Sequence, residues 1–172
     1  GTAGATAIGS LYFEGIHYPS ASGGETELLR FASDLYDAVG SIDGFSPHRA
    51  RTTAGGGIVF ETTSPTVTVS FRYDPADEHR WGVFGVTQNG GAIQSTTAPP
   101  TDTTTTLSIN SQSPGSLVRY RVILPPWSNP ILTGIDLEAG HELTAFSHPV
   151  RPVYVALGDS ITHGTGQNRS FD

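Results

Sequence analysis

The sequence predicts a mainly β protein, with a jelly-roll-like antiparallel β-sandwich followed by the first strand and the helix start of an α/β domain. Short runs of alternating apolar and polar residues, separated by turn residues at intervals of roughly 8–12 residues, are typical of such sandwiches. Gly occurs 21 times and Pro 12 times among the 172 residues, which is unfavourable for a helical bundle. A chain of this length has room for one domain of ordinary size.

The charge of the chain excludes two classes of partner. Nine Arg, no Lys and sixteen acidic residues give a net charge of −7. We therefore expect no nucleic-acid partner, because binding DNA or RNA requires a basic face that displaces counterions. We also expect no membrane partner, since the charge is repelled by anionic lipids and no apolar run is long enough to cross a bilayer. The chain has no Cys, which excludes disulfides and thiolate metal sites, and its start shows no signal-peptide pattern.

The first 40 residues are predicted to hold one strand and one short helix. Residues 1–10 are small and polar and are expected to be a loose lead-in, and the partial alternation in Leu11–Tyr18 indicates a first strand. Ser20–Gly24 is expected to be a turn or loop. A helix is then predicted, with Thr26 as its cap and Gly40 as its stop, because apolar residues recur at helical spacing: Leu28, Leu29, Ala32, Leu35, Tyr36 and Val39.

After residue 50 the apolar residues alternate with a period of two. Ile58–Glu61 and Val67–Arg72 are predicted strands, with Ser64-Pro65 as the turn between them. Val118–Leu124 alternates in the same way. Pro125-Pro126 is expected to end that strand, because proline has no N–H group to donate to a sheet.

Residues 83–106 are predicted to form a hairpin and a loop. Val83–Gln88 and Ala92–Thr96 flank Asn89-Gly90-Gly91, and these turn residues adopt the positive φ angles that tight hairpins require. Ser95–Thr106 is rich in Thr and Pro and is expected to be a loop with one edge strand.

The sandwich is predicted to end shortly before residue 150. Ile131–Leu137 leads to a turn at Glu138–His141, and Leu143–Phe146 is expected to run back. This makes about eight or nine strands in all. We expect residues 1–149 to form the sandwich domain and residues 150–172 to begin a second, catalytic domain.

The second domain is indicated by a change of pattern near the end of the chain. Val153–Leu157 is a nearly continuous apolar run, typical of a strand buried on both faces. Gly158, Asp159 and Ser160 follow directly, before an expected helix start. A sharp turn between a buried strand and a helix presents a serine hydroxyl as a nucleophile, and its backbone N–H can help to hold an oxyanion.

The segment Val155–Gly164 resembles the first conserved block of the SGNH/GDSL hydrolases, whose signature centres on Gly-Asp-Ser. The preceding sandwich resembles the N-terminal domain of two-domain members, which include carbohydrate esterases and some acyltransferases. The resemblance implies that Ser160 is the nucleophile and one oxyanion donor. It also implies further oxyanion donors, a Gly and an Asn, and a base with its orienting acid in an Asp-x-x-His motif.

None of those later blocks occurs in the 172 residues. We therefore expect the chain to be a fragment whose partner is the missing part of the catalytic domain, in the same chain or as a separate one. The resemblance places the catalytic base in that part. Because a neutral serine hydroxyl needs a base within hydrogen-bond reach, residues 1–172 alone are expected to be inactive.

Other candidate residues have weaker signals. His163 could act as a base or line the substrate site, since it lies three residues after Ser160, and Asp159 is expected to support the turn. Trp127 could stack on a sugar, or it could lie in the core or at a domain interface; Trp81 has the same interpretations. We expect no metal site, because two groups of acidic and histidine residues lack the spacing of Ca²⁺ or Zn²⁺ sites: Asp74, Asp77, Glu78 and His79, and Glu138, His141 and Glu142.

Three functions remain open on the sequence. The first is a serine esterase that removes O-acyl groups, especially O-acetyl groups, from a carbohydrate or other small-molecule ester. The second is an acyltransferase that moves the acyl group to a hydroxyl of a small metabolite, and the third is a carbohydrate-binding sandwich without catalysis. No metal or organic cofactor is implied by any of them. Localisation stays open, because a polysaccharide esterase would be exported and a biosynthetic transferase would stay in the cytoplasm.

Overall fold

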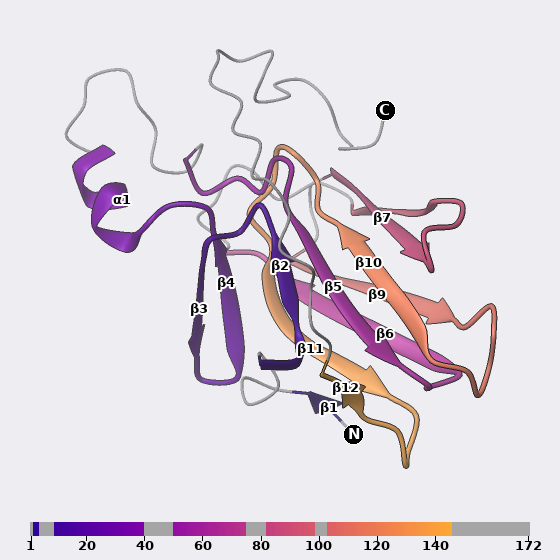
Figure 1. Ribbon diagram of the computed structural model, residues 1–172. Helices are drawn as coiled ribbons and strands as arrows, with labels where there is room; N and C mark the ends of the chain where they lie inside the picture. Colours follow the sequence, from indigo (N-terminus) through magenta and orange to yellow (C-terminus); the bar gives the residue numbers. More distant parts are fainter. Residues whose placement is uncertain (1, 4–8, 40–49, 75–81, 99–102, 146–172) are drawn as a thin grey trace.

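The structure is a computed structural model that describes residues 2–3, 9–39, 50–74, 82–98 and 103–145. Two antiparallel sheets pack face to face, and the helix α1 (Ser33–Val39) lies to one side of them (Figure 1). The predicted antiparallel β-sandwich is therefore confirmed. In the described part of the chain, no helix has the length and apolar character needed to span a membrane.

The first sheet, called sheet A, has the strand order β3-β4-β11-β6-β9. The short strand β1 (Thr2–Ala3) pairs with β11 beside this path. The other strands of sheet A are β3 (Tyr18–Ser22), β4 (Glu25–Leu29), β6 (Thr66–Arg72), β9 (Thr104–Asn110) and β11 (Ile131–Leu137).

The second sheet, sheet B, has the strand order β12-β5-β10-β7-β8. Its strands are β5 (Gly57–Thr62), β7 (Gly82–Gln88), β8 (Gln94–Ala98), β10 (Val118–Ile123) and β12 (Leu143–Thr144), with β2 (Tyr12–Glu14) also paired to β5. From β4 to β11, every connection except that of the β7–β8 hairpin crosses from one sheet to the other.

The β7–β8 hairpin forms at the predicted turn. Val86 pairs with Gln94 next to the turn, and Asn89 and Gly90 have φ angles of 51° and 75°. An asparagine followed by a glycine accepts these angles at little cost, and the turn twists in the same sense as the strands. The Asn-Gly signal predicted this hairpin correctly because the two turn residues themselves determine the backbone angles of the turn.

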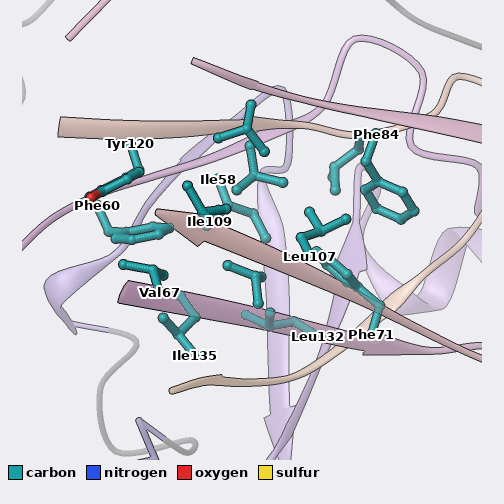
Figure 2. Close-up of a cluster of buried hydrophobic side chains, with 14 of the residues drawn as sticks. Ile58, Phe60, Val67, Phe71, Phe84, Leu107, Ile109, Tyr120, Leu132 and Ile135 are labelled. Atoms are coloured by element: carbon teal, nitrogen blue, oxygen red, sulfur yellow. The ribbon is translucent and has the colours of Figure 1, made fainter. Parts of the chain in front are cut away.

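The core lies between the inner faces of the two sheets. Figure 2 shows side chains from both sheets meeting in this layer, among them Phe71 of sheet A and Phe84 of sheet B. These two rings stack across the layer with centroids 4.8 Å apart, and Phe60 stacks on Tyr120 within sheet B at 5.3 Å. The alternating burial of β6 and β9 places one apolar side of each strand in this core.

The predicted helix with Thr26 as its cap is wrong in its first half. Residues Glu25–Leu29 form the strand β4, and only Ser33–Val39 is helical; the predicted stop, Gly40, lies outside the described residues. Thr26 and Leu28 are buried, because β4 pairs with β3 on one side and with β11 on the other. Tertiary pairing therefore overrides the helical spacing of the apolar residues.

Five other expectations need correction. The lead-in of residues 1–10 contains β1, and the single strand Leu11–Tyr18 is two strands that are broken at Gly15, where φ is 63°. Ser20–Ser22 belongs to β3, so the predicted turn narrows to the two glycines that follow. The loop Ser95–Thr106 contains most of β8 and the start of β9. β12 pairs with β5 of the other sheet and does not run back along β11.

We predict that Tyr120→Phe leaves the free energy of unfolding unchanged or raises it by about 1 kcal/mol. The Tyr120 hydroxyl is buried and has no hydrogen-bond partner in the structure, so its removal loses no bond and relieves a desolvation cost. Urea unfolding of the purified chain measures the change. Tyr73→Phe is the matched control: the Tyr73 hydroxyl accepts a hydrogen bond from Thr105 Oγ1, so that variant should be destabilised. A loss of stability in Tyr120→Phe as large as in the control would contradict the prediction.

Candidate functional site

The structure describes one of the four predicted site residues. Trp127 lies in the described part of the chain, whereas Asp159, Ser160 and His163 lie outside the described residues, as does Trp81. The roles predicted for Ser160 and its neighbours therefore stay predictions. The last described strand, β12, pairs with the edge of sheet B, and the Gly-Asp-Ser segment follows it in the sequence.

Trp127 sits in the connection that crosses from β10 in sheet B to β11 in sheet A. Two prolines end β10, as the sequence predicted, and both are buried. The Trp127 side chain is half-buried and the next residue, Ser128, is fully buried. The connection is thus a packed part of the sandwich, and Trp127 is less exposed than a platform on an open sheet face would be.

Thr53 holds this connection in place through hydrogen bonds to its backbone. Its backbone N–H donates to the carbonyl of Ser128 at 2.8 Å, and its hydroxyl lies 2.9 Å from the carbonyl oxygen of Pro125 and 3.0 Å from that of Ser128. Gly56 lets the chain pass close by, since a Cβ there would lie 2.8 Å from the Thr53 carbonyl oxygen and 3.2 Å from Leu124. These contacts set the backbone that carries Trp127.

The structure brings together no metal ligands in the described residues. His141 Nδ1 lies 3.0 Å from the hydroxyl of Thr63, so that ring is held by a hydrogen bond. Of the first acidic group, only Asp74 is described, and it is exposed. The prediction that these groups are not metal sites is not tested for Asp77, Glu78 and His79.

The outer face of sheet A holds two hollows that the sequence analysis did not identify. One, of about 300 Å³, is lined by Ser20, Ser22, Glu25, Glu27 and Arg72. The other, of about 70 Å³, shares Glu27 and is also lined by Leu28, Leu29, Arg51, Asp74, Asn129, Pro130 and Ile131. The only sequence signal for this face is the spacing of Tyr18, Ser20 and Ser22, which lie on one strand, whereas the sequence predicts a strand that ends at Tyr18 and a loop at Ser20–Gly24.

Two of the residues that line the larger hollow, Glu25 and Arg72, form an ion pair. Arg72 Nε donates to Glu25 Oε1 at 2.7 Å and Arg72 Nη2 donates to Oε2 at 2.5 Å. The hydrogen bond from Arg72 lowers the pKa of Glu25 below its usual value. The stability that this pair contributes is therefore present above the usual Glu pKa and is lost as the pH falls through the lowered one. Both side chains are more than a third exposed, so the contribution is small.

Comparison with solved structures identifies proteins with this fold. The salicylyl-acyltransferase SsfX3 from a tetracycline biosynthetic pathway is 17% identical, with a TM-score of 0.70 over 87% of this chain and 42% of that chain. A protein described as a GDSL-like lipase from Bacteroides ovatus is 14% identical, with a TM-score of 0.50 over 82% of this chain and 44% of that chain. A family two carbohydrate esterase from Clostridium thermocellum is less similar, with 13% identity and a TM-score of 0.46 over 57% of this chain and 29% of that chain.

The resemblance to the SGNH/GDSL hydrolases is confirmed at the level of the fold. An acyltransferase and a GDSL-like lipase share the sandwich that the sequence resemblance implied. No family model and no curated protein matches the sequence. The chain spans less than half the length of the first two proteins, at 42% and 44%.

We predict that Thr53→Val lowers the free energy of unfolding by about 1–3 kcal/mol. Valine has nearly the same shape but no hydroxyl, so the single hydroxyl hydrogen that lies between the Pro125 and Ser128 carbonyls is lost, and only Ser128 keeps the donor of the Thr53 backbone. Thermal unfolding followed by circular dichroism gives the change. Thr106→Val is the control, because Thr106 is exposed on the edge strand β9 and its replacement should have little effect. Equal midpoints for the two variants would show that the Thr53 hydroxyl does not hold the connection.

Proposed function

We propose that this chain belongs to a serine esterase of the SGNH type that removes O-acyl groups, and especially O-acetyl groups, from carbohydrates. The observation that carries the proposal is the Gly-Asp-Ser segment, which places Ser160 directly after an apolar strand sequence. The sandwich adds support, because proteins with the same fold include an acyltransferase and a GDSL-like lipase.

The proposed reaction has two steps. In the first, the Ser160 hydroxyl attacks the ester carbonyl carbon while a base takes its proton, and the bond to the sugar oxygen breaks as that oxygen receives the proton. In the second, water attacks the acyl-enzyme, the acid leaves, and Ser160 regains its hydroxyl. The backbone N–H of Ser160 would stabilise the oxyanion in both steps. Asp159 would support the turn, and His163 would line the substrate site.

A transferase is the second candidate, and one observation favours it. The structure with the TM-score of 0.70 is named as an acyltransferase. The first step of a transferase reaction is the same as that of the esterase. In the second step, the hydroxyl of a small metabolite attacks the acyl-enzyme in place of water. Product analysis with an added alcohol separates the two, since a transferase forms the new ester and an esterase mainly releases the free acid.

We predict that a fluorophosphonate labels Ser160 in the protein that includes the full catalytic domain. Ser160→Ala should abolish the labelling and lower kcat for an aryl acetate by a factor on the order of 10⁴ or more, because no other group replaces the nucleophile. Mass spectrometry of the labelled peptide identifies the site. The unfolding temperature should stay unchanged, so that the loss of activity reports on chemistry and not on folding.

Ser170→Ala is the matched control, since it removes a hydroxyl ten residues further along the same segment. It should keep both the labelling and the activity. Labelling of another serine, or full activity in Ser160→Ala, would refute the proposed nucleophile.

A further inference from the structure

The larger hollow on sheet A is built from residues of three strands that the pairing brings together. Ser20 pairs with Glu27, and Ile131 pairs with Glu27 on one side and with Arg72 on the other. Directly paired residues point to the same side of a sheet, so these side chains share one face. Leu28 points into the core, which places its neighbour Glu27 on the outer face.

Tyr18 lies at the end of the same row of side chains. It is two and four residues before Ser20 and Ser22 on β3, so all three share the outer face. Tyr18 is 51% exposed, which is more than any other large hydrophobic side chain in the described residues. An exposed ring beside polar side chains on a sheet face offers a flat apolar surface next to hydrogen-bonding groups.

The face has hydrogen-bonding groups that the protein itself does not use. The carboxylate of Glu27 and the hydroxyls of Ser20 and Ser22 are exposed and make no hydrogen bond or ion pair with the residues that the structure describes. The Asn129 Oδ1 atom, in the adjoining hollow, is buried and likewise lacks a partner. The pair with Glu25 occupies two of the five N–H donors of Arg72 and holds its guanidinium in place.

We propose that the outer face of sheet A around Glu27 binds a neutral oligosaccharide, with Tyr18 as the stacking platform. Sugar hydroxyls would donate to Glu27, sugar oxygens would accept from Arg72, and the apolar face of one ring would lie on Tyr18. The hollow of about 300 Å³ is at the lower end of the range for ligand sites, which suits one or two sugar rings of a longer chain. This site does not depend on the Ser160 chemistry.

The charges on this face disfavour other ligands. Glu25, Glu27 and Asp74 outnumber Arg72 and Arg51, so phosphates and acidic polymers are repelled. Most of the residues around the larger hollow are polar, which disfavours a lipid chain. A polyamine would be attracted by charge alone, and the experiment separates that case.

The test is to titrate the 172-residue chain with cellohexaose, with xylohexaose and, separately, with spermine. Isothermal titration calorimetry measures the binding, and the shifts of amide NMR signals show where it occurs. At least one of the two hexasaccharides should bind and shift amides of β3, β4 and β6. Tyr18→Ala should weaken that binding by about tenfold, and Glu27→Gln should weaken it without changing the fold, because both residues are exposed.

Tyr12→Ala is the matched control, since Tyr12 is an exposed tyrosine on sheet B, at 37% exposure. It should leave the affinity unchanged. The proposal is overturned if neither hexasaccharide binds at millimolar concentration, if spermine alone binds, or if Tyr12→Ala and not Tyr18→Ala removes the binding. None of these results bears on the Ser160 nucleophile, because the probes carry no acyl group.

Discussion

Phe71 and Phe84 stack across the layer between the two sheets, and this inter-sheet packing is the interaction on which the rest of the structure depends. Neither sheet can bury its apolar face alone, so strands such as β6 and β9 turn their alternate apolar side chains toward this shared layer. Within the described residues the core and the side chains packed against it extend from Leu11 to Leu143. The crossing from β10 to β11 is held by Thr53, and the Trp127 backbone takes its position from that contact.

The sequence predicted those parts of the fold that have a local cause. The Asn89-Gly90 turn and the alternation in Val67–Arg72 are local signals, and both elements form as expected. The first half of the predicted helix failed because Glu25–Leu29 pairs with β11, a strand about 100 residues further along the chain, and with β3, which buries Thr26 and Leu28. A helical spacing of apolar residues could not show that a distant strand would compete for them.

The two candidate sites also differ in whether their residues are adjacent in the sequence. Ser160 could be singled out from the sequence because the Gly-Asp-Ser signature that suggests its role consists of adjacent residues. The face around Glu27 could not, because Tyr18, Glu27 and Arg72 come from three separate strands and share a surface only through the register of sheet A. In the account proposed here, the sandwich binds sugar and the segment that follows it supplies the acyl chemistry, so the two functions have separate structural origins.

This separation requires that the sandwich be a folding unit of its own, with its boundary at residues 149–150. Differential scanning calorimetry of residues 1–149 beside residues 1–172 tests it directly. We expect a single cooperative transition at the same midpoint for both chains, because the core strands are common to both. If residues 1–149 show no cooperative transition while residues 1–172 do, the sandwich depends on the Gly-Asp-Ser segment, and the division into a binding sandwich and a catalytic segment is wrong.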